Sequence, residues 1–303
     1  MAKYVVKRVG LAIITVFIIC AITFFAMNAI PGGPFDGEKA TTPEVKAVLM
    51  ARYNLDKPVG EQFVLYLKNM LHGDFGVSLK TGRDIAATVW ESFAISARLG
   101  GMAALLALVL GLILGSIAAL TRNHWPDRVI VFFSTLATAV PSFVLATLLL
   151  LVFCIQLGWV PVWSTDNPNY VLPVISLAMY PMAYITRLTK TSMLDALGQD
   201  YVRTARAKGV PQWKVIFKHG LRNALIPVIT YVGPMLAFIL TGSLVVENIF
   251  TIGGLGSKFI TGITNRDYPM IMATTIFLAT LMVLLNLISD LVYKLVDPRI
   301  KFD

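Results

Sequence analysis

The chain has 303 residues, of which 56% are hydrophobic and only 14% are charged, and its mean hydropathy is +0.73. Soluble domains carry about 25% charged residues, so this composition excludes an ordinary soluble globular protein. Apolar runs of roughly 20 residues recur along the chain, and each is long enough to cross a hydrocarbon layer about 30 Å thick. The sequence therefore predicts an all-α integral membrane protein.

The residue types that carry catalysis or bind metals are sparse and scattered. Cys20 and Cys154 both sit inside apolar runs, and the three histidines, His72, His124 and His219, lack the mutual spacing of metal ligands. No paired carboxylates or nucleophile motif occur in the apolar runs. We expect no catalytic residue, no metal and no cofactor.

The first apolar run, from about residue 9 to residue 30, follows Lys3, Lys7 and Arg8. It is longer than the 7–15 residues of a signal-peptide core, so it indicates an uncleaved first span and a first section at 1–30. The pattern predicts six spans, and the other five lie at about 95–120, 129–157, 171–193, 225–246 and 270–292.

Residues 31–94 are expected to form a small helical segment between the first two spans. Thr42-Pro43-Glu44 is typical of a helix start, with a capping hydroxyl, a proline in the first turn and an acid near the helix N-terminus. A second amphipathic stretch carries Phe63, Leu67, Met70 and Leu71, and Gly73 stands where a helix would end. These helices either pack over an outer mouth or serve only as a structural plug.

Residues 95–293 then form a five-span core. Gly111 and Gly115 make a GxxxG pattern, which favours close approach of helix backbones. Prolines within or near the third to fifth spans either kink the helices for packing or mark a path that opens and closes, and they are Pro141, Pro173, Pro181, Pro227 and Pro234.

Charge sets the expected orientation. With the N-terminus inside, the cytoplasmic segments 1–8, 121–128, 187–222 and 290–303 hold about 16 Lys/Arg against about 6 Asp/Glu, and the rest of the chain holds about 10 against about 11. The positive-inside rule therefore places both termini, including the tail 294–303, in the cytoplasm and residues 31–91 outside. The pI of about 9.6 follows from this asymmetry, and we expect no nucleic acid as a partner.

The longest inner segment, residues 194–222, is the most informative. Residues 201–208 favour a helix, Gly209 fits a left-handed helix stop, and Pro211 fits the first position of a second helix. The predicted bend presents Ala205, Ala207 and Gly209 between basic residues. Such a hairpin either contacts lipid headgroups or fits a groove in another protein.

This loop resembles the EAA loop of binding-protein-dependent ABC importer permeases of the peptide and nickel branch. The resemblance rests on Thr204-Ala205-Arg206-Ala207-Lys208-Gly209 followed by Leu221-Arg222-Asn223-Ala224-Leu225-Ile226-Pro227. The family's Glu-Ala-Ala falls on Arg203, Thr204 and Ala205, so only its last position is kept.

Further likenesses run along nearly the whole chain, and the double glycine of the first is most similar to the B-type chain of oligopeptide permeases. They are Pro31-Gly32-Gly33-Pro34-Phe35, Tyr53-Asn54-Leu55-Asp56-Lys57-Pro58, Gly73-Asp74-Phe75-Gly76-Val77-Ser78, Val140-Pro141-Ser142-Phe143, Val246-Glu247-Asn248-Ile249-Phe250, Asn265-Arg266-Asp267-Tyr268 and Asp297-Pro298-Arg299.

The resemblance implies a type I importer permease of six spans in the cytoplasmic membrane of a bacterium or archaeon. It implies a second, non-identical permease, two ATP-binding subunits, an extracytoplasmic substrate-binding protein, the lipid bilayer and a peptide cargo. ATP hydrolysis would lie on the partner chains, because Gly253-Gly254-Leu255-Gly256-Ser257-Lys258 lacks the ending of a phosphate-binding loop.

The same resemblance assigns ATPase binding to the loop, with Ala205 expected at the docking contact. The residues concerned are Arg203, Thr204, Ala205, Arg206, Ala207, Lys208, Gly209 and Val210. Nickel, glutathione or another solute is the alternative cargo. An ion-coupled secondary transporter or channel, and a membrane-embedded enzyme, are the remote alternatives.

The charge asymmetry generates a test of topology. Single cysteines introduced at Lys46 and Lys214 are expected to lie on opposite sides of the membrane, because the positive-inside rule places residue 46 outside and residue 214 inside. An impermeant thiol reagent added to intact cells should label only the first. Labelling at position 214 in intact cells would contradict the six-span topology.

Overall fold

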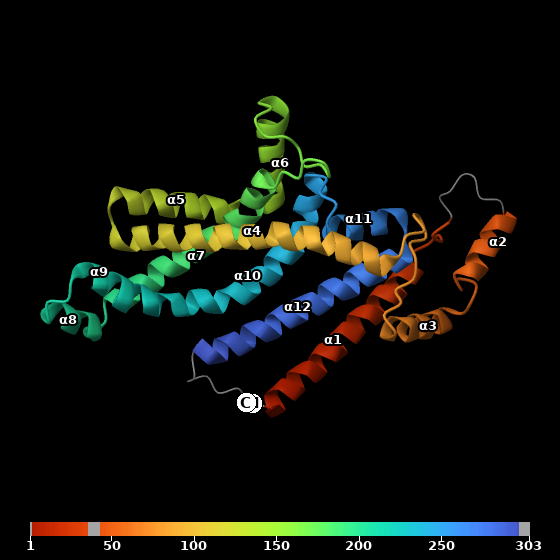
Figure 1. Ribbon diagram of the computed structural model, residues 1–303, viewed down its shortest axis with the longest axis horizontal. Helices are drawn as coiled ribbons and strands as arrows, with labels where there is room; N and C mark the ends of the chain where they lie inside the picture. The colour runs from red at the N-terminus through yellow and green to blue at the C-terminus, as the bar shows by residue number, and fades with distance from the viewer. Residues whose placement is uncertain (1, 36–42, 297–303) are drawn as a thin grey trace. The chain divides into compact units, whose positions relative to one another are not determined.

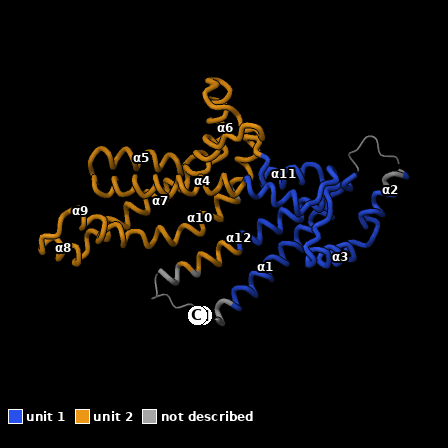
Figure 2. The backbone as a smooth tube through the Cα atoms, viewed as in Figure 1, with its two compact units in different colours: residues 1–95, 253–283 blue, residues 96–252, 284–303 orange. Residues whose placement is uncertain are grey.

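The computed structural model describes residues 2–35 and 43–296 (Figure 1). Within these ranges every regular element is a helix, apart from an isolated antiparallel bridge between Val77 and Asp84. The chain divides into two compact units, residues 1–95 with 253–283 and residues 96–252 with 284–303 (Figure 2). The all-helical prediction is confirmed.

In the described ranges five helices are long and apolar enough to cross a membrane. They are α1 (Ala2–Ala29), α4 (Ile85–Leu120), α7 (Val171–Leu197), the continuous helical segment that starts at Gln212 and includes α10 (Arg222–Ile249), and α12 (Tyr268–Val296). Helix α4 begins well before residue 95, because the Asp84 carboxylate accepts a hydrogen bond from the Ala87 N–H at 2.8 Å and so caps the first turn.

The expected third span at 129–157 is not one straight helix. Helix α5 (Trp125–Ala139) and helix α6 (Ser142–Leu149), which continues as the π-helix η1 (Leu150–Gln156), meet at an angle of 101°. Val140 takes an extended conformation (φ −89°, ψ 122°), because a residue that precedes proline is pushed out of the α region. The pair makes a sixth crossing only if the bent helix counts as one span.

The segment between α1 and α4 holds the two expected short helices, α2 (Pro43–Arg52) and α3 (Val59–Leu71). The predicted cap Thr42 lies outside the described residues. Helix α3 ends as predicted at Gly73 (φ 78°), whose N–H donates to the Met70 carbonyl at 2.9 Å while the Asp74 N–H donates to the Asn69 carbonyl at 3.0 Å. This pair of bonds is a Schellman stop, which satisfies the last carbonyls of the helix.

The first unit has an apolar core made by α1, α3 and α12. Cys20, Phe24 and Met27 of α1 are buried with Met272 of α12, and Phe63 of α3 packs against them. One face of α3 is thereby held against a predicted span, so this helix is anchored rather than free in solvent.

A second set of contacts ties the loop after α3 to the start of α12. The Ser78 hydroxyl donates to one oxygen of the buried Asp267 carboxylate at 2.5 Å, and the Leu79 N–H donates to the other at 3.1 Å. The Gly-rich stretch that follows α10 leads into α11 (Leu255–Asn265). Because Leu255 is buried, α11 belongs to the core of this unit.

In the second unit α4 and α7 approach each other at the GxxxG glycines. A Cβ built on Gly111 would lie 2.7 Å from Ile185 Cγ2, and one built on Gly115 would lie 2.5 Å from the Thr186 carbonyl oxygen. Real Cβ atoms do not come this close to a backbone oxygen, so only glycine permits this helix spacing. The packing role of the motif follows from this geometry.

This contact generates a matched pair of substitutions. Gly115→Ala is expected to destabilise the detergent-solubilised protein by about 1–3 kcal/mol, because the methyl group overpacks a helix crossing that cannot open locally. The control is Gly101→Ala on the same helix, where a Cβ meets no atom within 4 Å. Thermal unfolding monitored by circular dichroism should show a lower midpoint for the first variant only, and equal midpoints would contradict the close crossing.

Candidate functional site

The loop of residues 194–222 folds as a helical hairpin. Helix α8 (Asp200–Ala207) is followed by a bend, and then by α9 (Gln212–Lys214) and the π-helix η2 (Val215–Leu221), which run without interruption into α10. The predicted order of helix, sharp bend and helix is confirmed. Asp200 in the first turn of α8 and Arg206 in its last turn both complement the helix dipole.

The bend is a second Schellman stop. Gly209 has φ 71°, its N–H donates to the Arg206 carbonyl at 2.9 Å, and the Val210 N–H donates to the Ala205 carbonyl at 3.1 Å. A left-handed conformation of this kind favours glycine. Pro211 was predicted at the first helical position but is the N-cap of α9, and its carbonyl accepts the Lys214 N–H at 2.9 Å.

The inside of the hairpin is closed by small apolar side chains. Val202 and Val215 are fully buried, and Ala205 keeps only 8% of its surface exposed; Leu197 and Val210 pack against the three. Ala205 was expected at a docking contact with another protein. Its side chain is instead covered by its own chain, because residues 202 and 205 lie one turn apart on the inward face of α8.

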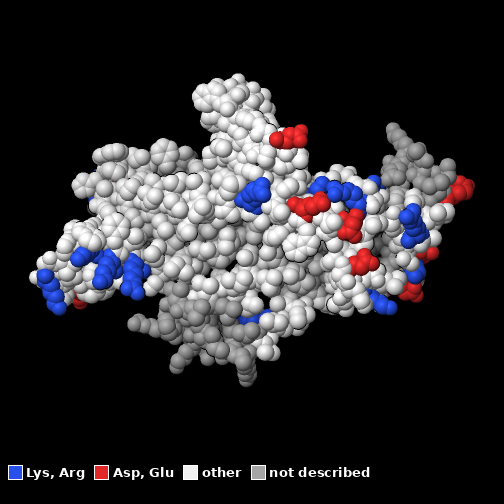
Figure 3. Space-filling model, viewed as in Figure 1, with Lys and Arg blue, Asp and Glu red and all other residues white. Residues whose placement is uncertain are grey.

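The outward face of α8 and the tip carry the remaining loop residues. Arg203, Thr204, Arg206, Ala207, Lys208 and Gly209 are exposed, and Val210 is half-buried. Basic side chains gather over the end of the second unit where α8 and α9 lie (Figure 3). Arg203 pairs with Asp200 at 3.3 Å, but both side chains are exposed, so the pair contributes little to stability. The face therefore offers small and cationic groups together.

The two arms of the hairpin are joined by a polar contact that sequence reasoning missed. The Asn223 side-chain amide donates to the Tyr201 hydroxyl at 2.8 Å and to the His219 carbonyl at 3.1 Å. Asn223 lies in the family-like stretch after the loop, but without a partner in view no role could be given to it. Asn223 thereby holds the start of α8 against the start of α10.

A buried ion pair lies where α5 begins. Lys190 of α7 donates to the Asp127 carboxylate at 2.5 Å, Asp127 is 5% exposed, and its second oxygen accepts the Asn123 N–H at 3.0 Å. The sequence contained one signal for this pair, since Lys190 falls inside the predicted span 171–193 and an ionisable residue there needs a partner. The pair fixes α5 to the part of α7 that leads into the hairpin.

Apolar contacts complete the base of the hairpin. Ala119 of α4, Met193 of α7 and Ala224 of α10 are buried together, with Leu197 and Ile216 packed against them. The hairpin is thus mounted on three long helices rather than hung from a flexible loop. The family-like stretch at 297–299 lies outside the described residues.

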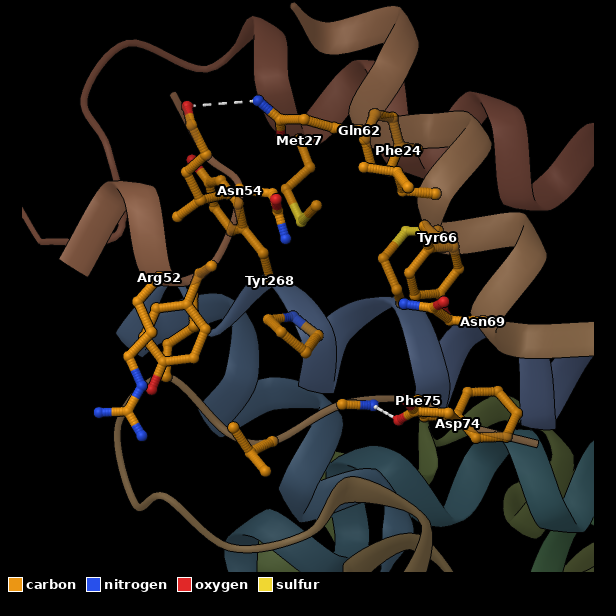
Figure 4. Close-up of a pocket in the computed structure, with 18 of the residues that line it drawn as sticks. Phe24, Met27, Arg52, Asn54, Gln62, Tyr66, Asn69, Asp74, Phe75 and Tyr268 are labelled. Carbon is orange, nitrogen blue, oxygen red and sulfur yellow. Dashed lines mark hydrogen bonds between the residues drawn. The ribbon is translucent and has the colours of Figure 1, made fainter. Parts of the chain in front are cut away.

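The first unit contains a cavity of about 470 Å³ (Figure 4). It is lined by the end of α1, the turn after α2, one face of α3, the loop after α3 and the start of α12. Apolar side chains such as Phe24 and Met272 stand beside polar ones such as Gln62 and Asp74. No sequence motif in this region indicated a ligand.

A polytopic helical membrane protein with a helical hairpin between two long apolar helices is the class that this fold and site define. The chain belongs to the family described as binding-protein-dependent transport system inner membrane component, which matches residues 111–302, and the N-terminal part of such membrane components matches residues 1–99.

Full-length relatives agree with this family. The chain is 45% identical to the dipeptide transport system permease protein DppB of Bacillus subtilis (strain 168), covering 99% of this chain and 98% of the relative. It is 42% identical to the oligopeptide transport system permease protein OppB of Haemophilus influenzae, covering 100% of both.

The fold resembles an inward-facing form of the MetNI methionine ABC transporter, with a TM-score of 0.56, 18% identity, and coverage of 70% of this chain and 95% of the other. It also resembles an amino acid ABC transporter solved with histidines, with a TM-score of 0.53, 18% identity, and coverage of 67% and 94%. The type I importer permease fold is thereby established.

The ion pair at the base of the hairpin can be tested by separating charge from packing. Asp127→Asn is expected to destabilise the protein by about 1–3 kcal/mol, because the Lys190 ammonium loses the charge that offsets its partial burial. Asp127→Leu combined with Lys190→Met should recover most of that loss, since no charge is then buried. The measurement is the thermal unfolding midpoint of each variant, and a double variant less stable than Asp127→Asn would contradict this account.

Proposed function

We propose that this chain is a permease subunit of an ATP-driven importer of peptides in the cytoplasmic membrane of a bacterium or archaeon. Full-length similarity to dipeptide and oligopeptide permeases supports a peptide cargo. Nickel or glutathione is the alternative cargo within the same class. The chain is non-catalytic, and ATP hydrolysis belongs to partner chains.

The hairpin α8–α9 is proposed to dock in a groove of an ATP-binding subunit. The observation that carries this is the division of α8 into an inward face sealed by Val202 and Ala205 and an outward face of small and basic residues around Ala207. A knob that is already rigid loses little conformational freedom on binding. Its cations predict a groove rimmed by Asp and Glu.

The remaining proposed partners are those of a binding-protein-dependent transport system. One copy contributes half of the path, and a second, non-identical permease contributes the other half. Two ATP-binding subunits engage the two hairpins, and an extracytoplasmic binding protein delivers the cargo to the outer side. In this arrangement both termini and the segment 194–222 face the cytoplasm, and residues 31–94 face outward.

Ala207 provides the sharpest test of docking. Ala207→Glu is expected to lower ATPase docking by about two orders of magnitude, because it inserts a bulky charge of the wrong sign into a closed contact, and each 1.4 kcal/mol changes affinity about tenfold. Since Ala207 is exposed in the free chain, the substitution should leave the unfolding midpoint unchanged. Co-purified ATPase and peptide uptake are measured at matched membrane levels.

Two matched variants separate docking from folding. Ala47→Glu makes the same change at an exposed position of α2, and it should keep both ATPase binding and uptake. Ala205→Glu buries the charge within the hairpin itself and should lower the unfolding midpoint as well. Normal ATPase binding by Ala207→Glu would remove the docking role from this face of α8.

A further inference from the structure

The cavity of the first unit has the size and the walls of a ligand site. Its volume of about 470 Å³ falls within the roughly 300–1,000 Å³ of typical small-molecule pockets. It lies entirely in the unit formed by residues 1–95 and 253–283, whereas the hairpin on which the proposed ATPase docking depends belongs to the other unit.

The two ends of the cavity carry opposite charges. Arg52 and Asp74 both line it, and Figure 4 shows them on opposite sides. The Arg52 guanidinium lies 5.9 Å from the Tyr53 ring and makes no hydrogen bond or ion pair with any described residue. Asp74 uses one carboxylate oxygen to accept the Gly76 N–H at 2.8 Å, and its second oxygen accepts no bond from the described residues. Each end thus places a charged group on the wall of the cavity.

Side-chain amides and apolar side chains line the cavity between these ends. Asn54, Gln62 and Asn69 line the cavity, and Gln62 is held in place because its Nε2 donates to the Lys57 carbonyl at 2.8 Å. That bond leaves the Gln62 side-chain oxygen as an acceptor. Phe24 and Met272 also line the cavity, and they supply apolar surface for a ligand side chain.

We propose that this cavity binds a short zwitterionic peptide, with its carboxylate end at Arg52 and its ammonium end at Asp74. Arg forms charge-assisted hydrogen bonds with carboxylates, and an ionised Asp accepts them from an ammonium group. Side-chain amides match the peptide bonds between the two ends. An internal loop of another protein has neither terminal charge, so the charged ends favour a free peptide.

This inference rests on the proposed function, because it makes the cavity an outer subsite for the cargo. It goes beyond that function in giving the permease its own contact with both peptide termini. Since the residues concerned are separate from the hairpin, the subsite and the ATPase docking can fail independently.

The test uses the full transporter complex in lipid nanodiscs, without its binding protein, and equilibrium dialysis of a labelled Ala-Phe-Ala tripeptide. The peptide is compared with its C-terminally amidated and N-terminally acetylated forms. Arg52→Gln is expected to weaken binding of the free peptide about tenfold and to leave binding of the amidated form unchanged. Asp74→Asn should weaken the free peptide to a similar extent and leave the acetylated form unchanged.

Arg83→Gln and Asp56→Asn serve as controls, because both residues are exposed on the same unit and line no part of the cavity. Both controls should bind the tripeptide as the wild type does. Absence of tripeptide binding by the wild-type complex would overturn the subsite. So would a further loss of affinity when Arg52→Gln binds the amidated peptide or when Asp74→Asn binds the acetylated peptide. If the subsite fails this test while the wild-type complex still takes up peptide and binds its ATPase, the proposed function stands. If the wild-type complex takes up no peptide, the proposed function itself is contradicted.

Discussion

The backbone of a chain that crosses hydrocarbon has to satisfy its own hydrogen bonds, because no water is present to do so. This constraint turns the long apolar runs into uninterrupted helices, and it gives special weight to the places where a helix stops. Two stops in the described chain use the same device, a left-handed glycine at 73 and at 209 that returns two N–H groups to the last turn. The residue after the first glycine lines the cavity, and the hairpin tip is built on the second.

Once the backbone hydrogen bonds are satisfied, close packing and paired charges decide how the helices pack against one another. In the second unit Gly111 and Gly115 bring α4 onto α7, and a Cβ on Gly233 of α10 would clash with Ser289 of α12. Two polar pairs are buried in the same unit: Lys190 binds Asp127, and the Ser96 hydroxyl donates to Glu247 at 2.7 Å. Small residues and satisfied polar groups therefore do what a hydrophobic driving force cannot do between helices that already lie in an apolar solvent.

The sequence was sufficient wherever a local rule decides the structure. Apolar run length located the long helices, and the glycines at 73 and 209 located two helix ends, because a left-handed stop depends on a single residue. Sequence reasoning failed where the outcome depends on distant partners. Pro141 indicated a kink but not its angle of 101°. No local pattern indicated that Asn223 would form a hydrogen bond with Tyr201 or that Asp127 would pair with Lys190. The cavity was missed for the same reason, since its walls come from segments more than 200 residues apart in the chain, such as Phe24 and Met272.

The two alanines of α8 show why a motif cannot be interpreted residue by residue without the helix that carries it. Ala205 occupies the one Glu-Ala-Ala position that this chain retains, and that made it the natural choice for a docking residue. Helical periodicity places it with Val202 on the inward face, so its small size serves the tight fold of the hairpin, where it is buried in one cluster with Val202 and Val215. Ala207, two positions on, turns outward and is exposed. A loop that both folds sharply and presents small side chains to a partner needs small residues for two separate reasons. In this chain the two alanines meet these needs on opposite faces of one short helix.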